Sequence, residues 1–169
     1  MFGICNLSSI PVRKNGDDKS EMISQLLYGD LYEVIEKKEK WVLIKINFDD
    51  YKGWIDYKQF SEIESENHFN ELIKNKAYSL DLINFVETYN KELIPILLGS
   101  NIGVSEYIKH TFDGEFSNKI RNRKQLIETA KLYLNAPYLW GGKTPFGIDC
   151  SGLSQMVYKI NGYKIPRDA

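Results

Sequence analysis

The sequence lacks the features that mark proteins bound to nucleic acids or to membranes. Its 22 basic and 23 acidic residues give a formal net charge of −1, so it has neither a basic nucleic-acid footprint nor an acidic tail. No apolar run approaches the roughly 18 residues that a membrane helix needs, and the N-terminus shows no basic stretch followed by an apolar one. We therefore expect a cytoplasmic protein with no nucleic-acid and no membrane partner.

Cysteine and histidine are also scarce. The two cysteines, Cys5 and Cys150, could form one disulfide, but thiols stay reduced in the cytosol, so we expect both to be free. His68 lies in an acidic stretch and His110 lies near a predicted turn. Neither context places a base beside a nucleophile, and we interpret both as ordinary surface histidines. No glycine-rich phosphate-binding pattern is present, and we expect no metal and no cofactor.

The chain does contain ample apolar material. Its 43% hydrophobic and 13% aromatic residues are enough for one sizeable domain or two small ones. Within residues 1–63, short apolar runs alternate with turn-rich or charged segments, a spacing that predicts a small β-barrel. In one of them Val42, Ile44 and Ile46 share a face, as in a half-buried strand. The five runs cover residues 4–12, 22–27, 31–35, 41–46 and 53–55.

Residues 64–120 predict a second, less regular β unit. A polar and acidic linker at 61–71 leads into a short helix near 69–73, and apolar runs follow at 82–86 and 93–98. Pro95 lacks the N–H group that a sheet ladder needs, so we expect the second run to be an edge strand.

Residues 121–169 have a helical pattern. A first helix should begin near residue 123 and end before Pro137. A second should begin at Cys150 and end at Asn161-Gly162 with a left-handed C-cap. The predicted apolar faces are Leu126, Ile127, Ala130 and Leu134 in the first helix, and Leu153, Met156, Val157 and Ile160 in the second.

The position of Cys150 at a helix start predicts a reactive thiol. The first helical turn has unpaired N–H groups and the positive end of the macrodipole, which favour the thiolate. Asp149 can cap this turn, and glycines at positions 141, 142, 147 and 152 would let a substrate backbone approach. Cys5, in a predicted strand, should be a packing residue. The alternative is that Cys150 is itself a buried cysteine acting as a small hydrophobe.

The run Tyr138 to Gly152, YLWGGKTPFGIDCSG, followed by the amphipathic helix and Arg167-Asp168-Ala169, resembles the NlpC family of bacterial cysteine peptidases. These enzymes cut the peptide stems of peptidoglycan. The preceding β segment resembles the SH3-like domain of members that cleave after γ-D-glutamate in free murein peptides. The resemblance implies an α+β fold with an SH3-like β-barrel (1–63), a second SH3-like unit (64–120) and the N-terminal helical part of a papain-like cysteine peptidase domain (121–169).

The resemblance also implies roles for residues around the thiol. Cys150 would be the nucleophile, and the Tyr138 hydroxyl beside it would help to hold the oxyanion or the substrate. Asp149 and Ser151 match positions that hold substrate in the family.

Two residues of the SH3-like domain match motifs that bind a free N-terminal L-alanine. Glu21 and Tyr51 would contact the amine of the substrate. We therefore expect both side chains to face the Cys150 cleft.

The sequence departs from the family at its end. The family's catalytic histidine lies on strands after the cysteine helix, whereas this sequence ends at Ala169. We therefore expect a C-terminally truncated and inactive chain, completed by a missing segment or a second chain. The apolar face of its last helix should be exposed, mobile or covered by another molecule.

The leading hypothesis is a cysteine endopeptidase that hydrolyses murein stem peptides at the γ-D-Glu–diamino acid bond. The alternative is a non-catalytic protein that binds peptides or cell-wall fragments.

Overall fold

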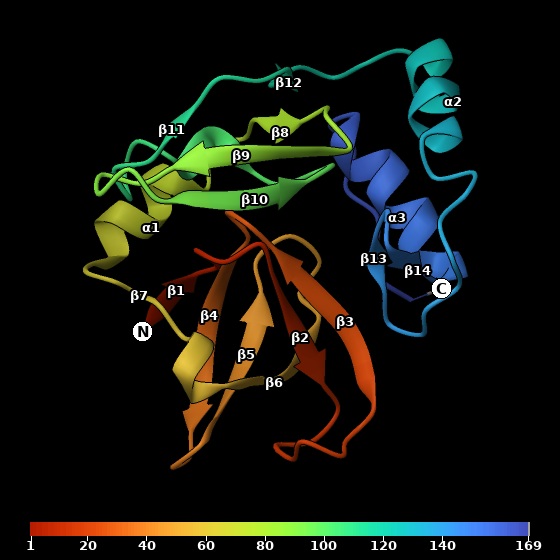
Figure 1. Cartoon of the computed structure of the whole chain (residues 1–169). Helices are drawn as coiled ribbons and strands as arrows, with labels where there is room; N and C mark the ends of the chain where they lie inside the picture. The colour runs from red at the N-terminus through yellow and green to blue at the C-terminus, as the bar shows by residue number, and fades with distance from the viewer. Residues whose placement is uncertain (169) are drawn as a thin grey trace.

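The computed structural model describes residues 1–168, so Ala169, the last residue of the motif above, lies outside it. The fold is α+β, with mostly antiparallel sheets and three α-helices (Figure 1). Within the described residues no helix is long and apolar enough to cross a membrane.

The N-terminal segment forms one antiparallel sheet of seven strands, in the order β3-β2-β6-β5-β4-β1-β7. The predicted run at 4–12 is two strands, because the chain leaves the sheet between Cys5 and Ser8. Strand β1 then pairs with β4 and β7, whereas β2 pairs with β3 and β6. The strands are β1 (Phe2–Ile4), β2 (Ser9–Arg13), β3 (Met22–Leu27), β4 (Leu31–Lys37), β5 (Trp41–Ile46), β6 (Lys52–Asp56) and β7 (Glu62–Ile63), with a 3₁₀ turn η1 (Tyr57–Gln59) before β7.

The predicted barrel is not closed. Strands β3 and β7 are the two edges of the sheet, and no pairing within residues 1–168 joins them. Strand β2 meets β6 at a single pair, Arg13 and Trp54. The β3 edge instead meets the C-terminal segment, because the backbone N–H of Lys143 donates to the Gln25 side chain at 2.8 Å.

The middle segment forms small sheets around one helix. Strand β9 is the centre of a three-stranded sheet ordered β10-β9-β11, so the strand that carries Pro95 is an edge, as predicted. The predicted short helix is present as α1, but it begins at Glu66, within the segment predicted as a linker. The elements are α1 (Glu66–Leu72), β8 (Tyr78–Ser79), β9 (Ile83–Glu87), β10 (Leu93–Leu97), η2 (Ile102–Val104), β11 (Thr111–Phe112) and β12 (Phe116–Ser117).

This segment shares a core with the N-terminal sheet. Phe69, Leu72 and Val86 pack in one cluster with Ile4 and Leu31. The predicted boundary at residue 63 thus falls within a continuous core.

The C-terminal segment contains α2 (Arg123–Lys131), β13 (Lys143–Thr144), β14 (Gly147–Ile148) and α3 (Cys150–Ile160). The apolar face predicted for the first helix is wrong in part, since Ile127 and Leu134 are exposed. Thr129 and Tyr133 are buried instead. The helix turns this side inward because the Thr129 hydroxyl accepts a hydrogen bond from Asn161 Nδ2 at 3.0 Å.

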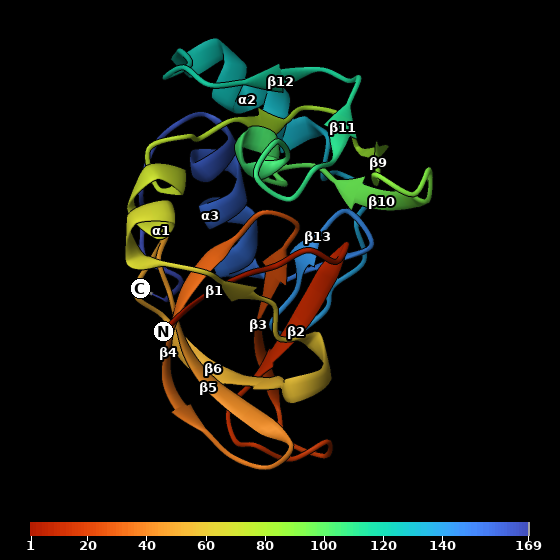
Figure 2. The ribbon, with the colours of Figure 1, turned by 90° about the vertical axis from the view of Figure 1, so that its left-hand side faces the viewer.

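The expectation of an uncovered apolar face on α3 is wrong. Met156, Val157 and Ile160 are buried against Leu27 and Leu98, and Tyr133 and Ile148 join the same cluster. In both ribbon views α3 lies beside the N-terminal sheet and the middle segment (Figures 1 and 2). The chain therefore covers this face with its own residues.

The end of α3 matches the predicted C-cap. Gly162 has φ +87°, and its N–H group donates to the Lys159 carbonyl. The N–H of Tyr163 donates to the Tyr158 carbonyl, and the two tyrosine rings pack edge to face. This is the Schellman arrangement with its accompanying side-chain contact.

Two lysines are buried where α3 and β13 meet the sheet. Lys159 Nζ lies 2.6 Å from Asp30 Oδ1, and although burial opposes its charge, Asp30 keeps the pKa of Lys159 above the ordinary value. Lys143 is 1% exposed. Burial, followed by repulsion from Lys159, lowers its pKa to about 8 despite attraction from Asp30 and Asp49.

Replacing Lys143 by methionine should raise the free energy of unfolding at pH 7 by roughly 1–3 kcal/mol, because the variant no longer buries a disfavoured charge. The pKa of Lys143 is about 8 when folded against an ordinary value of 10.5. Between these pH values the unfolded chain holds the extra proton, so wild-type stability rises with pH and the variant's advantage shrinks. Urea unfolding at pH 7, 9 and 10.5 measures this, with Lys58→Met as an exposed control. An advantage that stays constant with pH would contradict the assignment.

Candidate active site

The two cysteines have opposite environments. Cys150, the first residue of α3, is exposed, whereas Cys5 is fully buried. Cys5 lies after β1 rather than in a strand, and burial raises the pKa of its thiol well above the ordinary value. Only Cys150 therefore offers a thiol to a ligand.

A cavity of about 320 Å³ opens beside Cys150. Residues of the N-terminal segment, from β3 and from the turns between strands, form one wall, and residues of the C-terminal segment form the other. The lining consists of Lys14, Glu21, Ile23, Tyr51, Tyr138, Trp140, Asp149, Cys150, Ser151, Arg167 and Asp168.

Asp149 is the N-cap of α3, as predicted. Its Oδ1 accepts the N–H of Gly152 at 2.7 Å, and its Oδ2 accepts the N–H of Gly141 at 2.8 Å. Arg167, 2% exposed, donates to both oxygens at 3.0 and 2.6 Å. Burial would raise the pKa of Asp149, but Arg167 and the two N–H groups hold it below its usual value. With both oxygens occupied, the geometry favours a positioning role for Asp149 over the predicted contact with substrate.

Ser151 belongs to the same network. Its hydroxyl accepts a hydrogen bond from Arg167 Nη1 and lies 3.3 Å from Asp149 Oδ1. Ser151 also lines the cavity, so its side chain lies between the ion pair and the space for a ligand.

The glycines near Cys150 serve packing rather than substrate approach, contrary to expectation. Gly141 has φ +75°, and a Cβ there would lie 2.4 Å from the Met22 carbonyl oxygen. A Cβ on Gly152 would lie 2.4 Å from the Gly142 oxygen. The glycines let the loop before α3 lie directly against β3 and against the helix start.

The opposite wall contains both residues predicted from the N-terminal segment. Glu21 Oε1 accepts a hydrogen bond from Trp140 Nε1 at 2.7 Å, and Lys14 Nζ lies 3.6 Å from Glu21 Oε2. The Tyr51 hydroxyl donates to Asp168 Oδ2 at 2.8 Å. Burial and then Asp168 raise the pKa of Tyr51 to about 12. The structure thus brings Glu21 and Tyr51 to the same cavity as Cys150.

The cavity has an excess of negative charge. Its lining contains three carboxylates, on Glu21, Asp149 and Asp168, against the cations Lys14 and Arg167. Within the described residues, Asp149 pairs with Arg167 and Glu21 with Lys14, whereas Asp168 has no cation within 4 Å.

Asp168, Lys14, Arg167 and Trp140 were not among the site residues predicted from the sequence. The resemblance included Arg167 and Asp168 in its motif, which was the only signal for either residue. No sequence signal pointed to Lys14 or Trp140, because their contacts to Glu21 arise from packing.

Tyr138 is exposed and lies on the same cavity as the thiol. Its backbone forms a β-bridge with Ile148, two residues before Cys150. This bridge fixes the tyrosine beside the start of α3.

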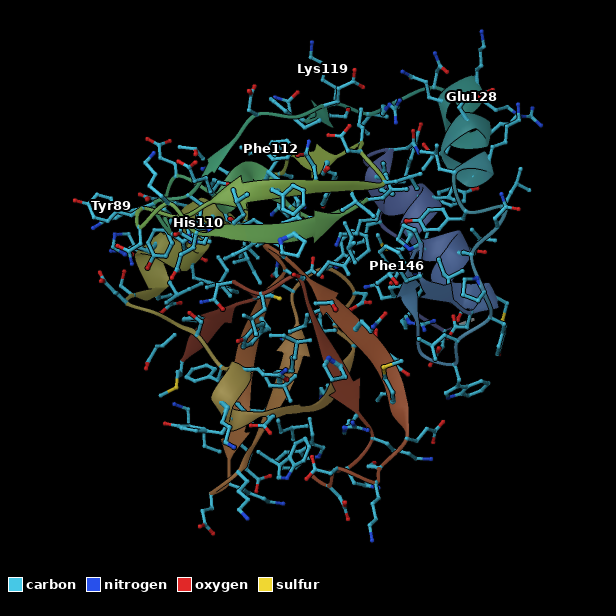
Figure 3. All side chains as sticks on the ribbon, in the orientation of Figure 1. Tyr89, His110, Phe112, Lys119, Glu128 and Phe146 are labelled. Atoms are coloured by element: carbon cyan, nitrogen blue, oxygen red, sulfur yellow. The ribbon has the colours of Figure 1, made fainter. Side chains whose placement is uncertain are left out.

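No histidine lines the cavity in the part of the chain that the structure describes. His110 Nδ1 lies 3.0 Å from the Tyr28 hydroxyl, and burial lowers the pKa of His110. Figure 3 shows His110 on the side of the middle segment, well away from Phe146 in the C-terminal segment. His68 lies in α1 beside Tyr107. Nor does any group of three or more potential metal ligands occur in residues 1–168.

Comparison with known proteins gives matches along most of the chain. Residues 12–60 match the bacterial dipeptidyl-peptidase SH3 domain, and residues 135–169 match the NlpC/P60 family. The chain is 29% identical to a γ-D-glutamyl-L-lysine dipeptidyl-peptidase of Bacillus cereus, over 89% of this chain and 54% of the relative. It is 24% identical to a protein of the same name from Bacillus subtilis, over 86% and 55%. The chain spans about half the length of these relatives.

Solved structures show the same fold. An NlpC/P60 family protein from Bacillus cereus superposes with a TM-score of 0.79 at 18% identity, covering 99% of this chain and 75% of that one. An NlpC/P60 endopeptidase from Photobacterium damselae gives 0.74, also at 18% identity, over 99% and 44%. The chain therefore carries a bacterial dipeptidyl-peptidase SH3 domain followed by part of a domain of the NlpC/P60 family, a family of cysteine peptidases, and it is homologous to γ-D-glutamyl-L-lysine dipeptidyl-peptidases.

Proposed function

We propose that this chain binds murein peptides with a free N-terminal L-alanine and presents the γ-D-Glu–diamino acid bond to Cys150. The observation that carries the proposal is the shared cavity, in which an exposed thiol lies opposite two carboxylates and a tyrosine. The names of the relatives, γ-D-glutamyl-L-lysine dipeptidyl-peptidases, agree with it. A dipeptidyl-peptidase must recognise the peptide amine two residues from the scissile bond, and one cavity with both features meets that need.

In the proposed complex the substrate amine lies beside Asp168, Glu21 and the Tyr51 hydroxyl. Asp168 has no cation within 4 Å in the described chain, so an ammonium group there would gain a charge-assisted hydrogen bond. The Cys150 thiolate would attack the γ-carbonyl carbon of D-glutamate and form a tetrahedral oxyanion. The free N–H groups of the first turn of α3 and the Tyr138 hydroxyl would donate to that oxyanion.

The reaction further needs a base for the thiol and an acid for the leaving amine. Because no histidine lines the described part of the cavity, we propose that this group comes from a further segment or a second chain. The same observation favours the alternative function, a non-catalytic protein that binds murein peptides. The two functions share the binding step and differ in hydrolysis.

Cys150 should react with iodoacetamide at least about 10-fold faster than Cys5, because Cys150 is exposed at a helix start whereas the Cys5 thiol is buried and neutral. Mass mapping of the alkylated peptides over time measures both rates. The Cys150→Ser variant should retain only the slow reaction. Faster labelling of Cys5 in the folded protein would refute Cys150 as the accessible thiol.

Asp168→Asn and Glu21→Gln should each weaken binding of L-Ala-γ-D-Glu about 10-fold, because each removes a charge-assisted contact to the amine. Binding of the N-acetylated peptide should be unaffected by either change. Calorimetric titration of both peptides measures this, with Glu39→Gln, an exposed change in the turn between β4 and β5, as the control. Equal losses of affinity for the free and the acetylated peptides would show that these carboxylates do not bind the amine.

The 169-residue chain alone should not release L-Ala-D-Glu from L-Ala-γ-D-Glu-diaminopimelate. Proton transfer by a positioned base contributes typically about 10²–10⁴-fold to such a reaction, and the described cavity holds no histidine. Mass spectrometry of the reaction mixture measures release, with Cys150→Ala as the blank. Turnover that depends on Cys150 would mean that His68, His110 or a second copy supplies the base.

A further inference from the structure

We propose that Asp49 and Gln155 are positioning residues that hold the amine-binding side of the cavity at a fixed distance from the Cys150 thiol. Neither residue lines the cavity. The inference rests on the proposed function of that cavity. It adds the contacts that hold the two walls of the cavity in a fixed relative position.

Asp49 lies in the turn between β5 and β6 and connects two walls of the site. Its Oδ1 accepts the backbone N–H of Tyr51 at 3.1 Å. Its Oδ2 accepts Gln155 Nε2 at 2.7 Å. One carboxylate thus fixes the backbone of an amine-site residue and, at the same time, the helix that begins with Cys150.

Gln155 extends this link to the end of the chain. It is fully buried on α3, and its Nε2 also lies 3.4 Å from the carbonyl oxygen of Ile165. The segment after Ile165 carries Asp168, whose carboxylate accepts the Tyr51 hydroxyl. Three segments are therefore joined in a closed ring: the β5–β6 turn, α3 and residues 165–168.

Stability alone does not account for a glutamine at this position. Its Oε1 is buried and has no hydrogen-bond partner within the described chain. A buried amide with an unpaired oxygen costs free energy that an apolar side chain of similar size would not. What Gln155 supplies is a directional contact, and a displacement of about 1 Å in a reactive complex can cost about 10²-fold in rate.

The Gln155→Met variant separates position from stability. Its unfolding temperature should change little, because loss of the hydrogen bond to Asp49 is offset by removal of the unpaired Oε1. Its Cys150 should be alkylated by iodoacetamide at a rate within about twofold of wild type. Its affinity for L-Ala-γ-D-Glu should fall about 10-fold, because the Tyr51–Asp168 pair is no longer held opposite the thiol. Ser154→Ala, on the exposed side of the same helix, is the control and should change none of these values.

A second readout needs no ligand. In the wild type, burial and Asp168 raise the pKa of Tyr51 to about 12. If Gln155→Met loosens the contact between Tyr51 and Asp168, the pKa of Tyr51 should fall below its wild-type value, because the part of the shift that Asp168 causes is lost. ¹³C NMR of the tyrosine side chains detects this change, with Tyr51→Phe assigning the signal.

A charge-neutral exchange tests the contact itself. Gln155→Glu alone places two carboxylates together and should lower peptide affinity and the pKa of Tyr51 as Gln155→Met does. Adding Asp49→Asn should restore part of both, because the asparagine amide can donate to the new carboxylate and its oxygen can still accept the Tyr51 N–H, whereas the carboxylate cannot donate to the Ile165 carbonyl.

The outcomes are distinguishable. If Gln155→Met changes the pKa of Tyr51 but the wild type binds no peptide, the positioning role is supported and the proposed function is refuted. If wild type binds the peptide and Gln155→Met leaves both affinity and Tyr51 titration unchanged, the positioning role is overturned. A double variant that recovers none of the affinity lost by Gln155→Glu would also overturn it.

Discussion

The buried ion pair between Arg167 and Asp149 is the contact on which the Cys150 cavity depends. Asp149 caps α3 through Gly152 and anchors the preceding loop through Gly141, while Arg167 joins both to the last described segment. Removing two charges from water costs several kcal/mol per ion, so such a pair is weak evidence for stability. Its effect here is geometric. Loss of either partner would leave an unpaired buried charge, and the three segments are therefore held in one arrangement.

The α3 helix meets the rest of the molecule through two kinds of contact. Toward the N-terminal sheet it presents Gln155 and Lys159, which bind Asp49 and Asp30. Toward the middle segment it presents Met156 and Ile160, which pack in an apolar cluster with Leu98. Apolar packing is non-directional, whereas buried hydrogen bonds tolerate little misalignment. The polar side therefore sets where the thiol lies relative to Glu21 and Tyr51, and the apolar side supplies burial.

Several structural predictions from the sequence were wrong for the same physical reason. The run at 4–12 has the pattern of a single strand, yet its halves pair with different neighbours, a choice made by distant strands. The glycines around Cys150 suggested open space, but a neighbouring strand and the loop's own backbone fill it. The α3 face was expected to lack cover because its family partners were expected later in sequence, whereas Leu27 and Leu98 already lie against it. Periodicity identifies which side of an element is apolar and leaves open what lies against it.

The sequence alone determined the local features of this protein: the helix that starts at Cys150, its Asp149 cap, its left-handed end at Gly162 and the edge position of the Pro95 strand. Each follows from backbone hydrogen bonds and steric limits within a few residues, which local sequence specifies. Family resemblance added Glu21 and Tyr51 as candidates. Only the tertiary structure decided that Trp140 meets Glu21 across 119 positions and that Asp168 meets Tyr51 across 117. Contacts at such separations depend on how α3 and the terminal segment pack against the sheet, and no local pattern encodes that packing.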